Sequence, residues 1–131
     1  MKKLAMIFAL SACCLLTAAD AAAQVKTRVR FPAGTHGTTV TGTVRGYAYH
    51  DYVAGASAGQ TMTLALTATG TVPVFTVFLP NGDNLDGASE SNDFSGALPV
   101  KGDYVIRVLM MRSAARRKGS VSNYTLKISI K

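Results

Sequence analysis

The segment YTLKISIK, residues 124–131, decides the fold because its apolar and polar side chains alternate without a break. In an extended chain, Tyr124, Leu126, Ile128 and Ile130 lie on one face and the polar side chains on the other. A period of two over eight residues predicts a β-strand with one buried face. The same period recurs at residues 28–31, 39–45, 61–67 and 104–110.

Three further segments have strand-like composition, at residues 47–52, 74–79 and 94–98. Turn-forming residues follow them, including Pro80-Asn81-Gly82-Asp83 and Pro99. About eight short strands of this kind predict an all-β chain, folded as a single antiparallel β-sandwich of jelly-roll-like form. Helix is expected only in the leader and in a turn at residues 113–117. The longest polar stretch, residues 83–93, is expected to form a flexible loop.

The first 23 residues have the composition of a secretory signal peptide. Lys2 and Lys3 precede an apolar segment at residues 4–19, and small residues precede Gln24. The apolar segment is shorter than the roughly 20 residues that span a membrane, so no membrane span is predicted. An alternative is the LSAC segment at residues 10–13, which has the form of a lipoprotein signal with Cys13 as the lipid-bearing residue. We favour cleavage before Gln24, because the apolar character continues beyond Cys13.

Residues 24–131 are expected to form one domain, since this length buries one core but not two. Both cysteines, Cys13 and Cys14, precede this region, so it has no disulfide and no thiol nucleophile. It holds twelve Lys and Arg against six Asp and Glu, a net charge of +6. This charge favours anionic partners, such as acidic proteins, cell-wall polymers or lipid head groups. Nucleic acid is not predicted as a partner, because a recognition helix and an evident stacking platform are both missing.

The sequence offers little for catalysis. His36 and His50 are the two histidines, and no Gly-x-Ser-x-Gly motif is present. His50 and Asp51 are neighbours in a predicted strand, so their side chains point to opposite faces. The acidic residues of the 83–93 segment do not have the spacing of an EF-hand. We predict no enzymatic activity, no metal ion and no cofactor.

The most charged part of the chain is the segment RSAARRK, residues 112–118, with four cations in seven residues. A connection between two strands does not require guanidinium groups, and arginine pairs with carboxylates and phosphates in two places. The segment therefore predicts an acidic partner, although a solvated surface loop remains the alternative reading.

A second cluster contains Tyr47, Tyr49 and Asp51, which share one face of a predicted strand, close to Arg45. If Tyr52 and the residues that follow it point inward, the first three point outward and could anchor an interface. The opposite assignment remains open, because tyrosine is also common in sandwich cores.

Several short segments together resemble the periplasmic inhibitors of goose-type (g-type) lysozyme. They span nearly the whole of residues 24–131: Arg30-Phe31, 41–49, Ala58-Gly59-Gln60, Leu98-Pro99, Gly102-Asp103-Tyr104, Arg107-Val108-Leu109, Arg112, Ala115-Arg116 and Asn123-Tyr124. The more specific part is residues 107–116 together with Gly46-Tyr47. The same framework is similar to the bacterial pre-peptidase C-terminal domain, a sandwich attached to secreted enzymes.

The resemblance implies a periplasmic inhibitor of g-type lysozyme that acts through a surface cluster. We expect a monomer that blocks the enzyme by placing a basic loop in its active-site cleft. The resemblance implies contact roles for Arg112 and Arg116, then for Tyr47, Tyr49 and Asp51, and we add Arg45 and Arg117 from the same clusters. The similarity to the pre-peptidase domain implies instead a non-catalytic module that binds cell-wall glycan or protein. One departure is Lys101, which stands where lysozyme inhibitor families have a serine before Gly102.

Overall fold

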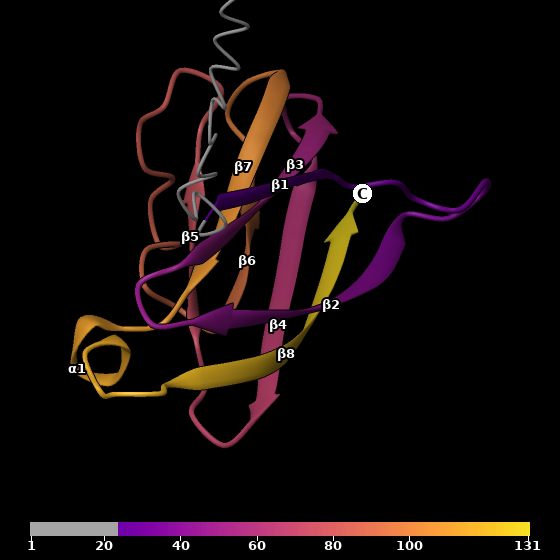
Figure 1. The fold of residues 1–131 in the computed structure, drawn as a ribbon. Helices are drawn as coiled ribbons and strands as arrows, with labels where there is room; N and C mark the ends of the chain where they lie inside the picture. Colours follow the sequence, from indigo (N-terminus) through magenta and orange to yellow (C-terminus); the bar gives the residue numbers. More distant parts are fainter. Residues whose placement is uncertain (1–23) are drawn as a thin grey trace, which may run out of the picture.

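The structure is a computed structural model that describes residues 24–131, and the predicted signal peptide with Cys13 lies outside the described residues. Two four-stranded sheets form a β-sandwich (Figure 1). Sheet 1 has the strand order β1 (Gln24–Arg28), β3 (Tyr49–Ala56), β7 (Gly102–Leu109), β5 (Val74–Phe78). Sheet 2 has the order β2 (Gly37–Arg45), β8 (Val121–Ile130), β4 (Thr61–Thr69), β6 (Asp93–Ala97). The predicted all-β sandwich is confirmed, and the helical turn expected near residue 113 is α1 (Arg112–Ala115).

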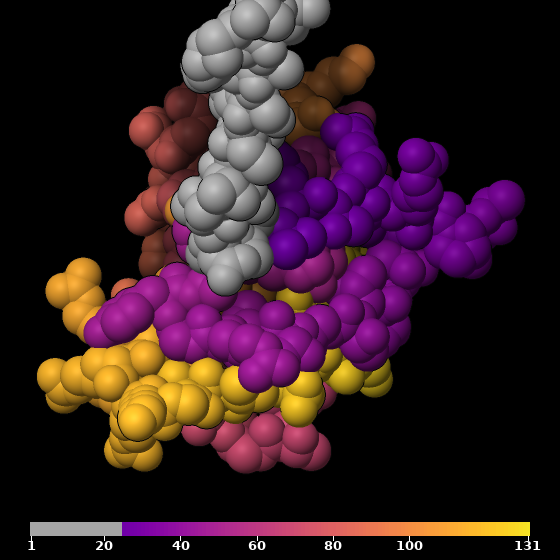
Figure 2. All heavy atoms as spheres, in the orientation of Figure 1, coloured from indigo at the N-terminus to yellow at the C-terminus, as the bar shows by residue number. Residues whose placement is uncertain are grey.

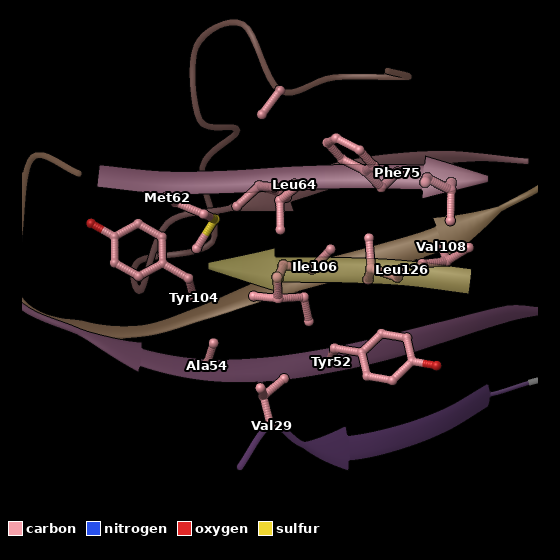
Figure 3. Packing of buried hydrophobic residues seen from close by; sticks show 14 of the residues in the cluster. Val29, Tyr52, Ala54, Met62, Leu64, Phe75, Tyr104, Ile106, Val108 and Leu126 are labelled. Carbon is pink, nitrogen blue, oxygen red and sulfur yellow. The ribbon is translucent and has the colours of Figure 1, made fainter. Parts of the chain in front are cut away.

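The core lies between the sheets and is filled by the residues that the period of two assigned to it. In β8, Tyr124, Leu126, Ile128 and Ile130 are at most 5% exposed. Figure 3 shows Leu126 and Leu64 of sheet 2 packed near Ile106 of sheet 1. Burial of large apolar side chains at about 1.5–3 kcal/mol each is the main source of stability for a fold with no disulfide.

The N-terminal strand differs from the prediction. β1 covers residues 24–28 rather than 28–31, and it pairs with β3 in parallel, with Gln24 opposite Tyr49. Val29 is buried, as the period of two implied, and its N–H still donates to the carbonyl of Val53 (2.8 Å). The chain then reaches Pro32, which has no N–H to continue such a ladder. Every other strand pair of the described residues is antiparallel, as predicted.

The polar segment at residues 83–93 packs on the sandwich and is hydrogen-bonded to β5. Leu85 and Ala88 are buried, and the N–H of Leu85 donates to the carbonyl of Val77 (2.9 Å). The N–H of Phe75 donates to the carbonyl of Ser91 (2.7 Å). The segment thus covers the free edge of β5, which protects the backbone of an edge strand from further pairing.

Three connections lie together at one end of the sandwich, and each crosses from one sheet to the other. They join β2 to β3 (residues 46–48), β4 to β5 (70–73) and β7 to β8 (110–120), the last of which contains α1. In the sheets β7 lies between β3 and β5, and β8 lies between β2 and β4. The connection with α1 therefore runs between the other two. We call these three connections the α1 end.

Candidate functional site

The basic segment is held in place by its small residues. Ala115 is 4% exposed and packs in the core, so one side of α1 is buried. The N–H groups of Ala114 and Ala115 donate to the carbonyl of Met111 (2.9 and 2.8 Å), which closes the turn. The hydroxyl of Ser120 donates to the carbonyl of Ala115 (3.1 Å). These contacts fix the backbone from which the cations project.

The cations of this segment, Arg112, Arg116, Arg117 and Lys118, are all exposed. Within residues 24–131 the ion pairs are those of Arg28 with Asp103 and of Arg107 with Asp51, each at 2.8 Å. The four cations therefore have no carboxylate partner in the part of the chain that the structure describes. An external anion can pair with them without displacing an internal one.

The turn between β2 and β3 lies against this segment. The N–H of Gly46 donates to the carbonyl of Ser120 (3.0 Å), and Gly46 has a φ of 55°, a conformation that favours glycine. A shallow hollow of about 510 Å³ lies between the two connections. It is lined by both basic and aromatic residues, among them Arg45, Tyr47, Arg116, Arg117 and Lys118. Four of the predicted contact residues therefore lie around this hollow: Arg45, Tyr47, Arg116 and Arg117. Arg112, at the start of α1, does not line it.

Tyr47 is the most exposed large apolar side chain of the described residues, at 65%. It lies in the turn before β3, so it projects beyond the end of sheet 1. An exposed tyrosine beside arginines is typical of interface centres, because the ring supplies apolar area and the hydroxyl remains able to bond.

Tyr49 and Asp51 point outward from sheet 1, since Tyr52 and Ala54 on the opposite face are buried in the core. The prediction left this choice open, and the structure decides it. Asp51 is nevertheless only 8% exposed, because Arg107 of β7 covers it. The guanidinium donates to both carboxylate oxygens, from Nε to Oδ1 (2.8 Å) and from Nη2 to Oδ2 (3.0 Å).

Arg107 also stacks on aromatic rings. Its guanidinium carbon lies 4.0 Å from the ring centre of Tyr49 and 5.0 Å from that of Phe78. The hydrogen bonds to Asp51 raise the pKa of Arg107, against the effect of its partial burial. The sequence analysis gave Arg107 no role in the site, because its pairing with Asp51 depends on the register of β3 and β7.

We expect the substitution Asp51→Asn to lower the free energy of unfolding by about 1.5 kcal/mol, because one of two hydrogen bonds to a charged donor is lost and the guanidinium faces an amide. Chemical denaturation of the variant measures this loss. Asp103→Asn is the matched control, since its pair with Arg28 is more than half exposed at both side chains. We expect no measurable loss there, and equal losses in the two variants would contradict a special role for the Asp51 pair.

His50 and Asp51 do not form a pair, as predicted. His50 stacks on the ring of Tyr52 with a centroid distance of 4.2 Å, and its Nε2 lies 2.9 Å from Oγ1 of Thr27. Burial lowers the pKa of His50, and the nearby Asp51 acts in the opposite direction.

Among residues 24–131 no group of three or more His, Cys, Asp or Glu side chains is arranged to hold a metal ion. Over the same range, no helix has the length and apolar character needed to cross a membrane.

The element that departs from the family pattern, Lys101-Gly102-Asp103-Tyr104, lies at the opposite end of the sandwich. Tyr104 is buried, and its hydroxyl donates to the carbonyl of Val100 (2.6 Å). Gly102 has a φ of 148°, and a Cβ there would lie 2.7 Å from Cγ of Pro80. The geometry assigns this element a structural role in the connection between β6 and β7.

Comparison with known proteins supplies relatives over most of the chain. No protein-family model matches it. A curated relative, the inhibitor of g-type lysozyme from Escherichia coli K12, is 31% identical over 120 residues, which are 89% of this chain and 90% of that protein. The crystal structure of PliG from Aeromonas hydrophila, a periplasmic inhibitor of g-type lysozyme, is 32% identical with a TM-score of 0.71. That match covers 82% of this chain and 97% of PliG.

Two further solved structures bear on the alternatives. PliG from Salmonella Typhimurium is 27% identical with a TM-score of 0.66, over 82% of this chain and 98% of that one. The pre-peptidase C-terminal domain of a Bacillus anthracis collagenase is 14% identical with a TM-score of 0.53, over 82% of this chain and 96% of that one, and shares the fold alone. The protein is periplasmic and is not an enzyme, in agreement with the PliG structures, which are described as periplasmic lysozyme inhibitors. By its identity and coverage, the chain belongs to the family of periplasmic inhibitors of g-type lysozyme.

Proposed function

We propose that this protein inhibits a g-type lysozyme by placing the segment of residues 112–118 in the acidic active-site cleft of the enzyme. The observation that carries the proposal is a group of four exposed cations, in and directly after a fixed helical turn, that have no carboxylate partner among residues 24–131. The family relationship supports the choice of target.

The physical basis is electrostatic blockade. The cleft of a glycosidase holds catalytic carboxyl groups, which a guanidinium can contact through two parallel hydrogen bonds. The anchoring of Ala115 lowers the entropy lost on binding, because the backbone of the segment is already ordered. Each such pair contributes about 1.5–3 kcal/mol where water is excluded. Two such pairs contribute about 3–6 kcal/mol, so tight inhibition also requires the contact area that surrounds them.

The predicted residues take different roles in this proposal. Arg112 and Arg116 pair with the carboxylates, while Arg45 and Arg117 strengthen the local positive potential. Tyr47 covers the contact and excludes water from it. Asp51 acts indirectly, since it holds Arg107, which in turn supports the ring of Tyr49.

The attraction in this proposal is local. Many lysozymes are basic proteins, and the net charge of +6 over residues 24–131 opposes their approach at low ionic strength. Pairing inside a cleft is less screened by salt than repulsion across open solvent. Moderate salt is therefore expected to weaken the repulsion more than the contact.

The test is a titration of the protein, purified from the periplasm, into a g-type and a chicken-type lysozyme that digest peptidoglycan. We expect progressive loss of g-type activity and unchanged chicken-type activity. Calorimetry with the g-type enzyme alone, without peptidoglycan, is expected to give a one-to-one complex of two monomers. Equal protection against both enzymes, or heat only when peptidoglycan is present, would favour binding of the substrate instead.

A further inference from the structure

The exposed apolar side chains are unevenly distributed. Five large apolar residues of the described chain are well exposed: Val25, Tyr47, Val72, Val100 and Met111. Three of the five, Tyr47, Val72 and Met111, belong to the α1 end. Val100 lies in the connection between β6 and β7 at the opposite end.

Val72 belongs to the connection between β4 and β5, which the sequence analysis did not connect with the site. The structure ties this connection to the start of β8, because the hydroxyl of Ser122 donates to the carbonyl of Thr71 (2.6 Å). Its flanks are also fixed, since Thr69 is opposite Asn123 and Val74 is opposite Leu109. In Figure 2 this turn protrudes at the bottom of the molecule, next to the yellow start of β8. Val72 therefore lies on the side of α1 that is opposite to Tyr47.

Met111 begins the basic segment directly before Arg112. Its backbone carbonyl accepts the hydrogen bonds that close α1, but its side chain is 45% exposed and does not belong to the core cluster. The side chain of Val72 is likewise exposed, at 44%, and does not belong to the core cluster. Neither side chain has a packing role that explains an apolar residue at its position.

The cations gather at the same end as these apolar side chains. The three connections of the α1 end, with Arg45 at the end of β2, contain five cations and no carboxylate. The acidic residues of the part of the chain that the structure describes lie elsewhere: Asp51 and Asp103 in sheet 1, Asp83, Asp86 and Glu90 in the segment along β5, and Asp93 at the start of β6. Charge complementarity therefore favours an acidic partner, and the exposed apolar side chains favour a partner that also has apolar surface.

We infer that Val72 and Met111 form an apolar margin of the inhibitory surface, opposite the margin formed by Tyr47. The inference rests on the proposed function and extends it, because it states the chemistry of the partner's surface. The partner presents carboxylates in a cleft whose two borders are apolar. Apolar contact on both sides removes water from the central ion pairs, and an ion pair is stronger where the effective dielectric constant is lower.

The first test compares the dissociation constants of serine variants for g-type lysozyme. Val72→Ser combined with Met111→Ser is expected to weaken binding about tenfold, because two partly buried apolar contacts are lost. Val100→Ser is the matched control, since Val100 is 46% exposed but lies at the other end. We expect its dissociation constant to be unchanged. The serine double variant should also keep the salt dependence of the wild type, because it removes no charge.

The second test reports contact directly. No cysteine occurs in residues 24–131, so Val72→Cys and Val100→Cys each introduce a unique thiol. Saturating g-type lysozyme is expected to slow maleimide labelling at position 72 at least several-fold and to leave labelling at position 100 unchanged. If wild-type protein inhibits the enzyme but position 72 stays fully reactive and the serine variants bind normally, this inference is wrong and the proposed function stands. If wild-type protein does not bind the enzyme, both are wrong.

Discussion

The double variant Arg112→Ala, Arg116→Ala is expected to inhibit g-type lysozyme at least a hundredfold less strongly than the wild type, while it unfolds at the same denaturant concentration. Both side chains are exposed and have no carboxylate partner among residues 24–131, so their removal leaves no buried group unsatisfied. Loss of two charge-assisted contacts in the complex corresponds to about 3 kcal/mol, or more than a hundredfold in the inhibition constant.

Two further double variants distinguish the effect of the direct arginine contacts from the effect of net charge. Lys101→Ala with Lys127→Ala removes two cations outside the α1 end and leaves Arg112 and Arg116 in place. Inhibition by this control is expected to remain within about twofold of the wild type, because distant exposed charges contribute little. Arg112→Lys with Arg116→Lys keeps the charge but not the planar pair of donors, and we expect intermediate inhibition. Unchanged inhibition by the alanine double variant would refute the proposed role of residues 112–118.

The sequence predicted those features of the site that depend on neighbouring residues. The alternation of residues 124–131 identified the buried face of β8, and the turn predicted at residues 113–117 corresponds to α1. The cations of residues 112–118 could be found by composition alone. The direction of Tyr47 was left open by the sequence, and the burial of Tyr52 and Ala54 in the structure decides it.

Features that depend on strand order and register could not be predicted in the same way. The pair of Asp51 with Arg107 joins residues 56 positions apart, through the register of β3 with β7. Val72 lies at the α1 end because β8 lies between β2 and β4, which places the β4–β5 connection beside α1. Leu85 and Ala88 anchor a segment whose composition is otherwise that of a loop. In each case the deciding contact is made by residues that are distant in the sequence.

The substitution Gly42→Ala is expected to have the largest effect on stability among the changes considered. Gly42 lies in β2, on its core side, and a Cβ there would lie 2.5 Å from the hydroxyl oxygen of Tyr124 and 2.7 Å from its Cζ. The two tyrosine hydroxyls, of Tyr52 and Tyr124, are hydrogen-bonded to each other at 2.6 Å, and both residues are 2% exposed. Burial raises the pKa of both phenols, so the pair stays neutral. The hydroxyl of Tyr52 also lies 3.3 Å from Nδ1 of His50, whereas the hydroxyl of Tyr124 is bonded to that of Tyr52.

An added methyl group therefore has to displace Tyr124 within a packed core and break its bond to Tyr52. We expect the free energy of unfolding to fall by about 3 kcal/mol, the sum of overpacking and one buried hydrogen bond. Urea denaturation followed by far-ultraviolet circular dichroism measures the loss. Gly37→Ala is the matched control on the same strand, because a Cβ there meets only the carbonyl oxygen of Ile128 at 3.5 Å, an ordinary contact.

A double-mutant cycle with Tyr124→Phe tests the cause. Removal of the hydroxyl relieves the closest contact of the new methyl group, and the bond to Tyr52 is already absent in that background. Gly42→Ala is then expected to cost less by about 1 kcal/mol or more than in the wild type, a coupling typical of residues in direct contact. Additive losses would instead show that the hydroxyl of Tyr124 is not the cause, and would place the cost of Gly42→Ala in the contact with the ring carbons or in the backbone of β2.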